Sequence, residues 1–133
     1  MKLRRLQSAF ITVFFVAFSC AGCAEKGPER YDFSGAVTFG GKPVPAGTIE
    51  FEPDGAAKNA GPQVVVAIKD GRYETPPGKG TVGGPHIVRI FGYDGVPNIE
   101  GGSIEGAAIF PPYETRLDLP KQSSTHDFDV PGR

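Results

Sequence analysis

Tryptophan is absent from the 133-residue chain, and methionine occurs once. Both cysteines, Cys20 and Cys23, lie near the N-terminus, so a disulfide cannot cross-link the rest of the chain, which must fold on its hydrophobic core alone. No apolar run reaches the roughly 20 residues that a membrane-spanning helix needs. No window keeps a 3.6-residue apolar period long enough to predict a helix.

Glycine and proline are abundant instead, with 19 and 13 copies. In a helix interior each glycine costs about 1 kcal/mol and each proline about 3 kcal/mol, so this composition argues against a helical bundle. Charged residues make up 22% and hydrophobic residues 39% of the chain. These values exclude a purely polar disordered chain and a multi-span membrane protein. The composition favours short strands joined by many turns.

The N-terminus has the pattern of a signal peptide. Lys2, Arg4 and Arg5 precede a ten-residue apolar segment, residues 9–18, which is the usual length of a signal-peptide core and too short to span a bilayer. The segment Ser-Cys-Ala-Gly-Cys at residues 19–23 resembles the lipobox of bacterial lipoproteins. The resemblance implies that Cys23 is lipidated and that residues 1–22 form a cleaved signal peptide.

Two alternatives to Cys23 remain open. Cys20 occupies the position where the lipobox usually has an aliphatic residue, and it is itself a possible acylation site. In that case Phe18 would lie where a small residue is expected. An uncleaved anchor is the other alternative, although the apolar segment is short.

Removal of the leader makes the chain acidic. Residues 1–22 contain three of the 14 basic residues and none of the 15 acidic ones, which leaves a net charge of −4. An acidic chain argues against a nucleic-acid partner. Residues 23–30 are interpreted as the lipidated cysteine and a short polar tether, and residues 31–133 as the domain. The predicted location is an exported protein, lipid-anchored to a bacterial membrane, periplasmic or surface-facing on the outer membrane.

Alternating apolar and polar residues predict strands throughout the domain. Turn signals rich in glycine and proline separate these segments. The pattern predicts an all-β fold, an antiparallel β-sandwich of about seven strands. The predicted strands are residues 31–39, 48–52, 63–69, 72–75, 86–92, 107–110 and 125–130.

Several motifs in this order are similar to carboxypeptidase regulatory-like domains, which have a transthyretin-like (prealbumin-like) fold. The resemblance covers residues 34–130, with His86 where those domains usually have tyrosine. It implies a transthyretin-like sandwich in a small bacterial lipoprotein. The matching segments are S-G-A-V-T at 34–38, G-K-P-V-P-A-G-T-I-E-F at 41–51, K-D-G-R-Y at 69–73, G-P-H-I-V-R-I at 84–90 and I-F-P-P-Y-E-T at 109–115.

Catalytic motifs are weak in this sequence. Residues 78–83 read G-x-G-x-x-G, but prolines on both sides exclude the strand and helix that a dinucleotide site needs. His86 and His126 are the two histidines, too few for a typical zinc site without cysteine ligands. Transthyretin-like hydrolases end in Tyr-Arg-Gly-Ser, which the C-terminus Val-Pro-Gly-Arg does not match. We therefore predict no catalytic residues, no metal and no cofactor.

The glycine-rich loop at residues 93–106 is the best candidate for binding. Tyr93, Asp94 and Asn98 are its predicted ligand-binding residues. The predicted function is a non-enzymatic binding or structural module of the cell envelope, with a protein, peptide or glycan partner. A carbohydrate- or metal-binding accessory protein is the first alternative, and a small hydrolase of transthyretin-like fold is the second.

Overall fold

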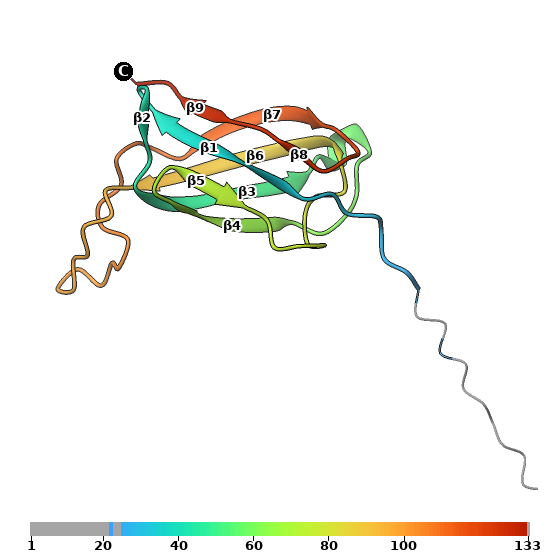
Figure 1. The fold of residues 1–133 in the computed structure, drawn as a ribbon, viewed down its shortest axis with the longest axis horizontal. Helices are drawn as coiled ribbons and strands as arrows, with labels where there is room; N and C mark the ends of the chain where they lie inside the picture. The colour runs from blue at the N-terminus through green and yellow to red at the C-terminus, as the bar shows by residue number, and fades with distance from the viewer. Residues whose placement is uncertain (1–21, 23–24, 133) are drawn as a thin grey trace, which may run out of the picture.

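The computed structural model describes Gly22 and residues 25–132 (Figure 1). Cys20, Cys23 and the predicted signal peptide apart from Gly22 lie outside the described residues. The described residues contain nine strands and a short 3-10 turn, η1 (Gly55–Ala57). The strands are β1 (Phe33–Phe39), β2 (Lys42–Pro43), β3 (Ala46–Pro53), β4 (Val64–Lys69), β5 (Arg72–Glu74), β6 (Gly84–Tyr93), β7 (Tyr113–Leu119), β8 (Ser124–Thr125) and β9 (Phe128–Val130). No helix among the described residues is long and apolar enough to cross a bilayer.

The strands form one curled sheet, a half-barrel, in the order β2-β1-β5-β4-β3-β6-β7 (Figure 1). All neighbours along this path are antiparallel, whereas β8 and β9 pair with β1 in parallel. The longest pairings join β3 to β6 and β6 to β7. The all-β, mainly antiparallel architecture predicted from the sequence is therefore confirmed.

The core lies inside the curve of the sheet and follows the alternation of the strands. Every second residue of β6 is buried, including Val88 and Ile90, which have no exposed surface. Three aromatic rings from separate strands meet there: Phe51, Tyr73 and Phe128 have centroids 5.8 to 6.2 Å apart and tilted planes, a favourable aromatic arrangement. The absence of tryptophan does not prevent an aromatic core.

Several local predictions differ from the structure, and the two-residue strand β2 is one that the sequence analysis did not list. Residues 113–119 form β7, which the sequence analysis did not list as a strand. Residues 107–110 contribute an isolated bridge between Tyr93 and Ala108 in place of a strand. The strand predicted at 125–130 is interrupted at residues 126–127, where the Asp127 carboxylate accepts from the Ala36 amide at 2.8 Å.

Tyr73 links the core to residues 126–127, between β8 and β9, and its hydroxyl makes the stability of the fold depend on pH. Its hydroxyl donates to the carbonyl oxygen of His126 at 2.7 Å, and burial, followed by the charge of Asp127, raises the pKa of Tyr73 above its ordinary value. The unfolded chain ionises this phenol above about pH 10 while the folded chain keeps it neutral, so stability is full below that pH and falls as the pH rises.

We expect Tyr73→Phe to lower the free energy of unfolding by about 1 kcal/mol at pH 7, because the partly buried carbonyl of His126 loses its donor. The variant should also lose less stability than the parent between about pH 9 and pH 11, because it lacks the Tyr73 phenol, whose pKa is raised by folding. Urea unfolding of both proteins at pH 7, 9 and 11 measures these free energies. If both proteins lost the same free energy of unfolding between pH 9 and pH 11, the role assigned to Tyr73 would be wrong.

Candidate functional site

The connection between β6 and β7 projects from one end of the half-barrel (Figure 1). We call residues 94–108 the projecting loop. The polar N-terminal tether leaves the domain at the opposite end. The loop therefore extends away from the predicted membrane attachment.

The projecting loop is held in shape by its own hydrogen bonds. Oδ1 of Asp94 accepts from the amides of Val96 and Ala107 at 2.9 and 3.1 Å. Asn98 and Ser103 exchange main-chain hydrogen bonds of 2.8 and 3.0 Å, and Oδ1 of Asn98 accepts from Gly101 at 2.9 Å. Such side-chain bonds to nearby amides stabilise turns. The loop is thus a small ordered hairpin.

These contacts change how the three predicted ligand-binding residues are understood. Asp94 and Asn98 are exposed, and the oxygens named above organise the loop from within. Tyr93 is half-buried at the end of β6. Their role in binding a ligand stays a prediction, but their observed contacts shape the surface that other residues present.

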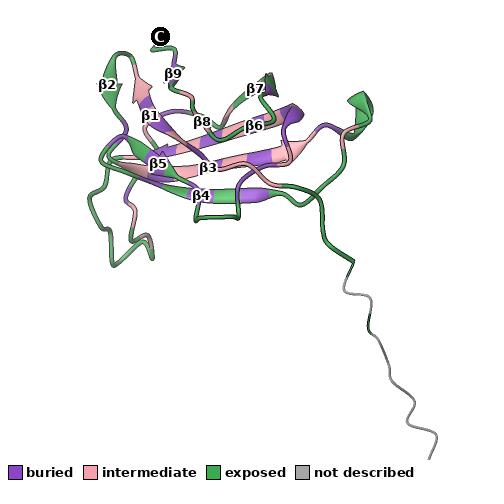
Figure 2. Cartoon of the chain, turned by 45° about the vertical axis from the view of Figure 1, so that its right-hand side comes forward, coloured by how far each residue is buried: buried purple, intermediate pink, exposed green. Residues whose placement is uncertain are grey.

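Three large apolar side chains of this hairpin are exposed. Val96, Ile99 and Ile104 are 65%, 90% and 86% exposed, and Val65 is the one other large hydrophobic residue of the described chain that is comparably exposed. Figure 2 shows the loop as mostly exposed surface. Exposed apolar side chains gathered on one element are typical of an interaction surface. The sequence analysis missed them, although isoleucine in a glycine-rich segment without strand alternation is itself a signal.

Two hollows lie at the same end of the domain. One, of about 550 Å³, is formed within the loop between Asp94, Ile99 and Ala107. The other, also about 550 Å³, lies where the loop returns to the sheet and is lined mainly by apolar residues. The rings of Phe39 and Phe110, which line it, have centroids 4.9 Å apart and tilted planes. A partner contacting the loop tip therefore meets further apolar surface beside it.

The residues considered for chemistry are separated in the structure. His86 is buried in the core, where Nδ1 lies 2.9 Å from the carbonyl oxygen of Gly84 and Nε2 has no hydrogen-bond partner. The ring of His126 packs against Phe128 at 4.7 Å. No three His, Cys, Asp or Glu side chains of the described chain are placed to hold a metal ion together.

The glycine-rich segment at residues 78–83 has a structural role. The amide of Gly78 donates to the carboxylate of Asp32, and Thr81 exchanges main-chain hydrogen bonds with Tyr31. A Cβ on Gly80 would overlap the carbonyl oxygen of Tyr31. These glycines thus let one loop lie directly on the chain that enters β1.

Arg89 lies on the outer face of the sheet between Glu52 and Glu114 and forms ion pairs with both. The hydrogen bonds to these carboxylates raise the pKa of Arg89. Because two acidic groups flank the guanidinium, this position does not attract an anionic ligand. The outward orientation agrees with the alternation in β6, where Val88 and Ile90 point inward.

Comparison with protein families, curated proteins and solved structures finds no match to this chain.

Proposed function

We propose that this chain is a non-enzymatic, lipid-anchored binding module of the bacterial cell envelope. In this proposal Cys23 carries the lipid and residues 24–30 tether the domain. The projecting loop is the binding element, and its partner is an envelope protein, peptide or glycan. The observation that carries the proposal is the group of exposed Val96, Ile99 and Ile104 on an ordered hairpin.

We further propose a transthyretin-like sandwich as the finer description of the domain. The pairing pattern supports it: β4, β3, β6 and β7 form one antiparallel group. A second group is built on β1, which pairs with β5 antiparallel and with β8 and β9 parallel. The β4–β5 hairpin joins the two groups through one residue pair, Lys69 and Arg72. The inward faces of both groups contribute to the common core.

The order within the projecting loop supports a binding role. Ordering a flexible loop on binding costs free energy, and a hairpin already closed by its own hydrogen bonds avoids most of that cost. Burial of a solvent-exposed apolar side chain by a partner contributes about 1.5–3 kcal/mol to the binding free energy. The two isoleucines at the tip would together contribute about 3–6 kcal/mol toward the cost of association.

We expect the double variant Ile99→Ser/Ile104→Ser to capture its partner at least tenfold less, an effect of roughly 1.4 kcal/mol or more. Its melting temperature should stay within about 2 °C of the parent, because both side chains are almost fully exposed in the fold. The measurement is capture from envelope fractions and from a glycan array by the full chain purified in detergent.

Ala56→Ser/Ala57→Ser is the matched control, since it introduces the same two serines at exposed positions outside the loop. The control should capture the same partner as the parent. Undiminished capture by the double variant would exclude the loop as the binding element. A parent protein that retains neither protein nor glycan would exclude the binding-module proposal.

A further inference from the structure

A second surface, separate from the projecting loop, lies at the edge of β4. This strand pairs with β3 along its whole length, from Val64 to Lys69. On its other side it pairs with β5 at Lys69 alone, because the remainder of β5 leaves to pair with β1. In the part of the chain that the structure describes, the rest of this edge has no strand partner.

The free main-chain groups on this edge are identified by the alternation of the strand. The amide of Asp70 donates to Pro45, so residues an even number of positions away direct their amides and carbonyls to the β3 side. Val65 and Ala67 therefore direct theirs to the open side. Together they present two N–H and two C=O groups in the spacing of an extended strand.

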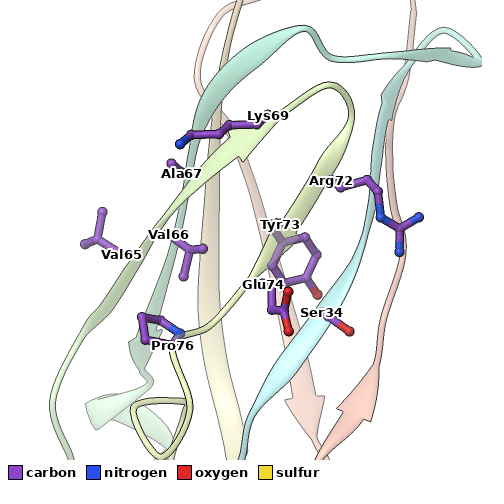
Figure 3. Close-up of a pocket in the computed structure, with 9 residues that line it drawn as sticks. All are labelled: Ser34, Val65, Val66, Ala67, Lys69, Arg72, Tyr73, Glu74 and Pro76. Atoms are coloured by element: carbon purple, nitrogen blue, oxygen red, sulfur yellow. The ribbon is translucent and has the colours of Figure 1, made fainter.

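Space for a partner exists beside these groups. A recess of about 690 Å³ lies between β4 and the departing β5 (Figure 3). Val65 and Ala67 line its outer side, while Val66 and Tyr73 contribute apolar surface deeper in. The recess thus offers main-chain pairing along one wall and an apolar position for an inward-pointing side chain.

This edge also lacks the features that usually prevent strand addition. β4 contains no proline and no bulge, and its exposed Val65 has 58% of its surface accessible. The other ends of the sheet are protected differently: β2 contains Pro43, and the outer face of β7 carries Glu114, Arg116 and Asp118.

Charge at the hairpin end indicates what kind of strand fits. Lys69 and Arg72 lie directly opposite each other on exposed positions, a like-charged pair that destabilises a hairpin. Neither belongs to an ion pair within the described residues. In Figure 3 the Lys69 side chain extends above Ala67, while Arg72 points toward β1 and Glu74 lies farther along β5. An acidic side chain opposite Ala67 would neutralise Lys69.

We propose that the edge of β4 binds an extended peptide segment of a partner protein by adding it as an antiparallel strand. The peptide pairs its main chain with Val65 and Ala67. It places an acidic residue opposite Ala67, next to Lys69, and an apolar residue opposite Val65, two positions later. Main-chain pairing supplies affinity in this mode, and the alternate side chains supply selectivity.

The test uses a fluorescent peptide, acetyl-Thr-Glu-Val-Val-Thr-amide, titrated by anisotropy against the full chain in detergent. A peptide with lysine in place of glutamate, and one with N-methyl groups on the glutamate and second valine, are the controls. We expect both controls to bind at least about tenfold more weakly, because they lose the ion pair and the main-chain donors respectively. Equal binding of all three peptides would overturn the proposal.

Variants of the protein test the same geometry from the other side. Val65→Pro removes an amide that faces the recess and is outside the ladder, so it should keep the melting temperature and weaken peptide binding about tenfold. Val66→Pro removes an amide that faces β3 and should unfold the domain. Lys69→Glu should reverse the preference between the glutamate and lysine peptides, and a retained preference would overturn the charge assignment.

Sedimentation of the full chain separates the peptide from a second copy of the protein. We expect no dimer that depends on Val65. A dimer abolished by Val65→Pro would assign the edge to self-association and overturn the peptide proposal.

Discussion

Replacement of Gly47 by alanine is expected to unfold the domain or lower the free energy of unfolding by more than about 4 kcal/mol. Gly47 lies in β3, and a Cβ built there would overlap the carbonyl oxygen of Phe91 on β6. A main-chain carbonyl cannot relieve the overlap by changing rotamer, as a flexible side chain does. The two strands β3 and β6 would therefore have to move apart. Effects of this size come from a few mechanisms, and overpacking against a fixed core is one of them.

The position of β3 explains why the sheet cannot relax around this alanine. Six residue pairs join β3 to β4 and eight join it to β6, so a shift at Gly47 disturbs the pairings on both sides. Gly55→Ala is the matched control, because a Cβ at Gly55 meets no atom within 4 Å. The control should change the free energy of unfolding by less than about 0.5 kcal/mol. Urea denaturation followed by circular dichroism compares the variants, and a Gly47→Ala protein as stable as the control would contradict the packing described for β3.

The local alternation of the sequence was sufficient for most of the sheet. β4 and β6 were predicted almost to their ends from their β-branched residues and the turn signals that flank them, and in both strands the burial alternates from residue to residue. β7 has the same alternation at Tyr113, Thr115, Leu117 and Leu119, but two preceding prolines obscured its start. The burial of His86 also follows from alternation, because it shares a face with Val88 and Ile90.

Contacts between distant segments were beyond the reach of the sequence. The parallel pairing of β9 with β1 joins residues about 90 positions apart, and no local pattern encodes the direction of such a pair. The free edge of β4 has the same origin, because it exists only where β5 turns away to β1. The candidate loop was located from its glycines, whereas its apolar surface depends on which isoleucines remain uncovered after folding.

Replacement of Cys23 by alanine is expected to release the protein from the membrane. In the proposed function this sulfur carries the lipid, and each buried CH₂ of an acyl chain contributes about 0.8 kcal/mol to anchoring. One chain gives marginal binding and two give stable attachment, so loss of the acylation site should move nearly all of the protein to the soluble fraction. Residues 25–29 are exposed in the structure, which agrees with a tether between lipid and domain.

Intact mass spectrometry and membrane fractionation distinguish the two cysteines. Cys20→Ala is the matched control, because it makes the same chemical change three residues earlier, and it should retain both the acyl mass and the membrane association. Within the described residues, the first hydrogen bonds that attach the N-terminal segment to the domain run from the Arg30 side chain to the carbonyl oxygens of Lys79 and Gly80. Neither substitution should therefore alter the melting temperature of the domain. An acyl mass that persists in Cys23→Ala and disappears in Cys20→Ala would transfer the lipid to Cys20. A membrane-bound protein without acyl mass in either case would instead indicate that residues 9–18 remain as an uncleaved anchor.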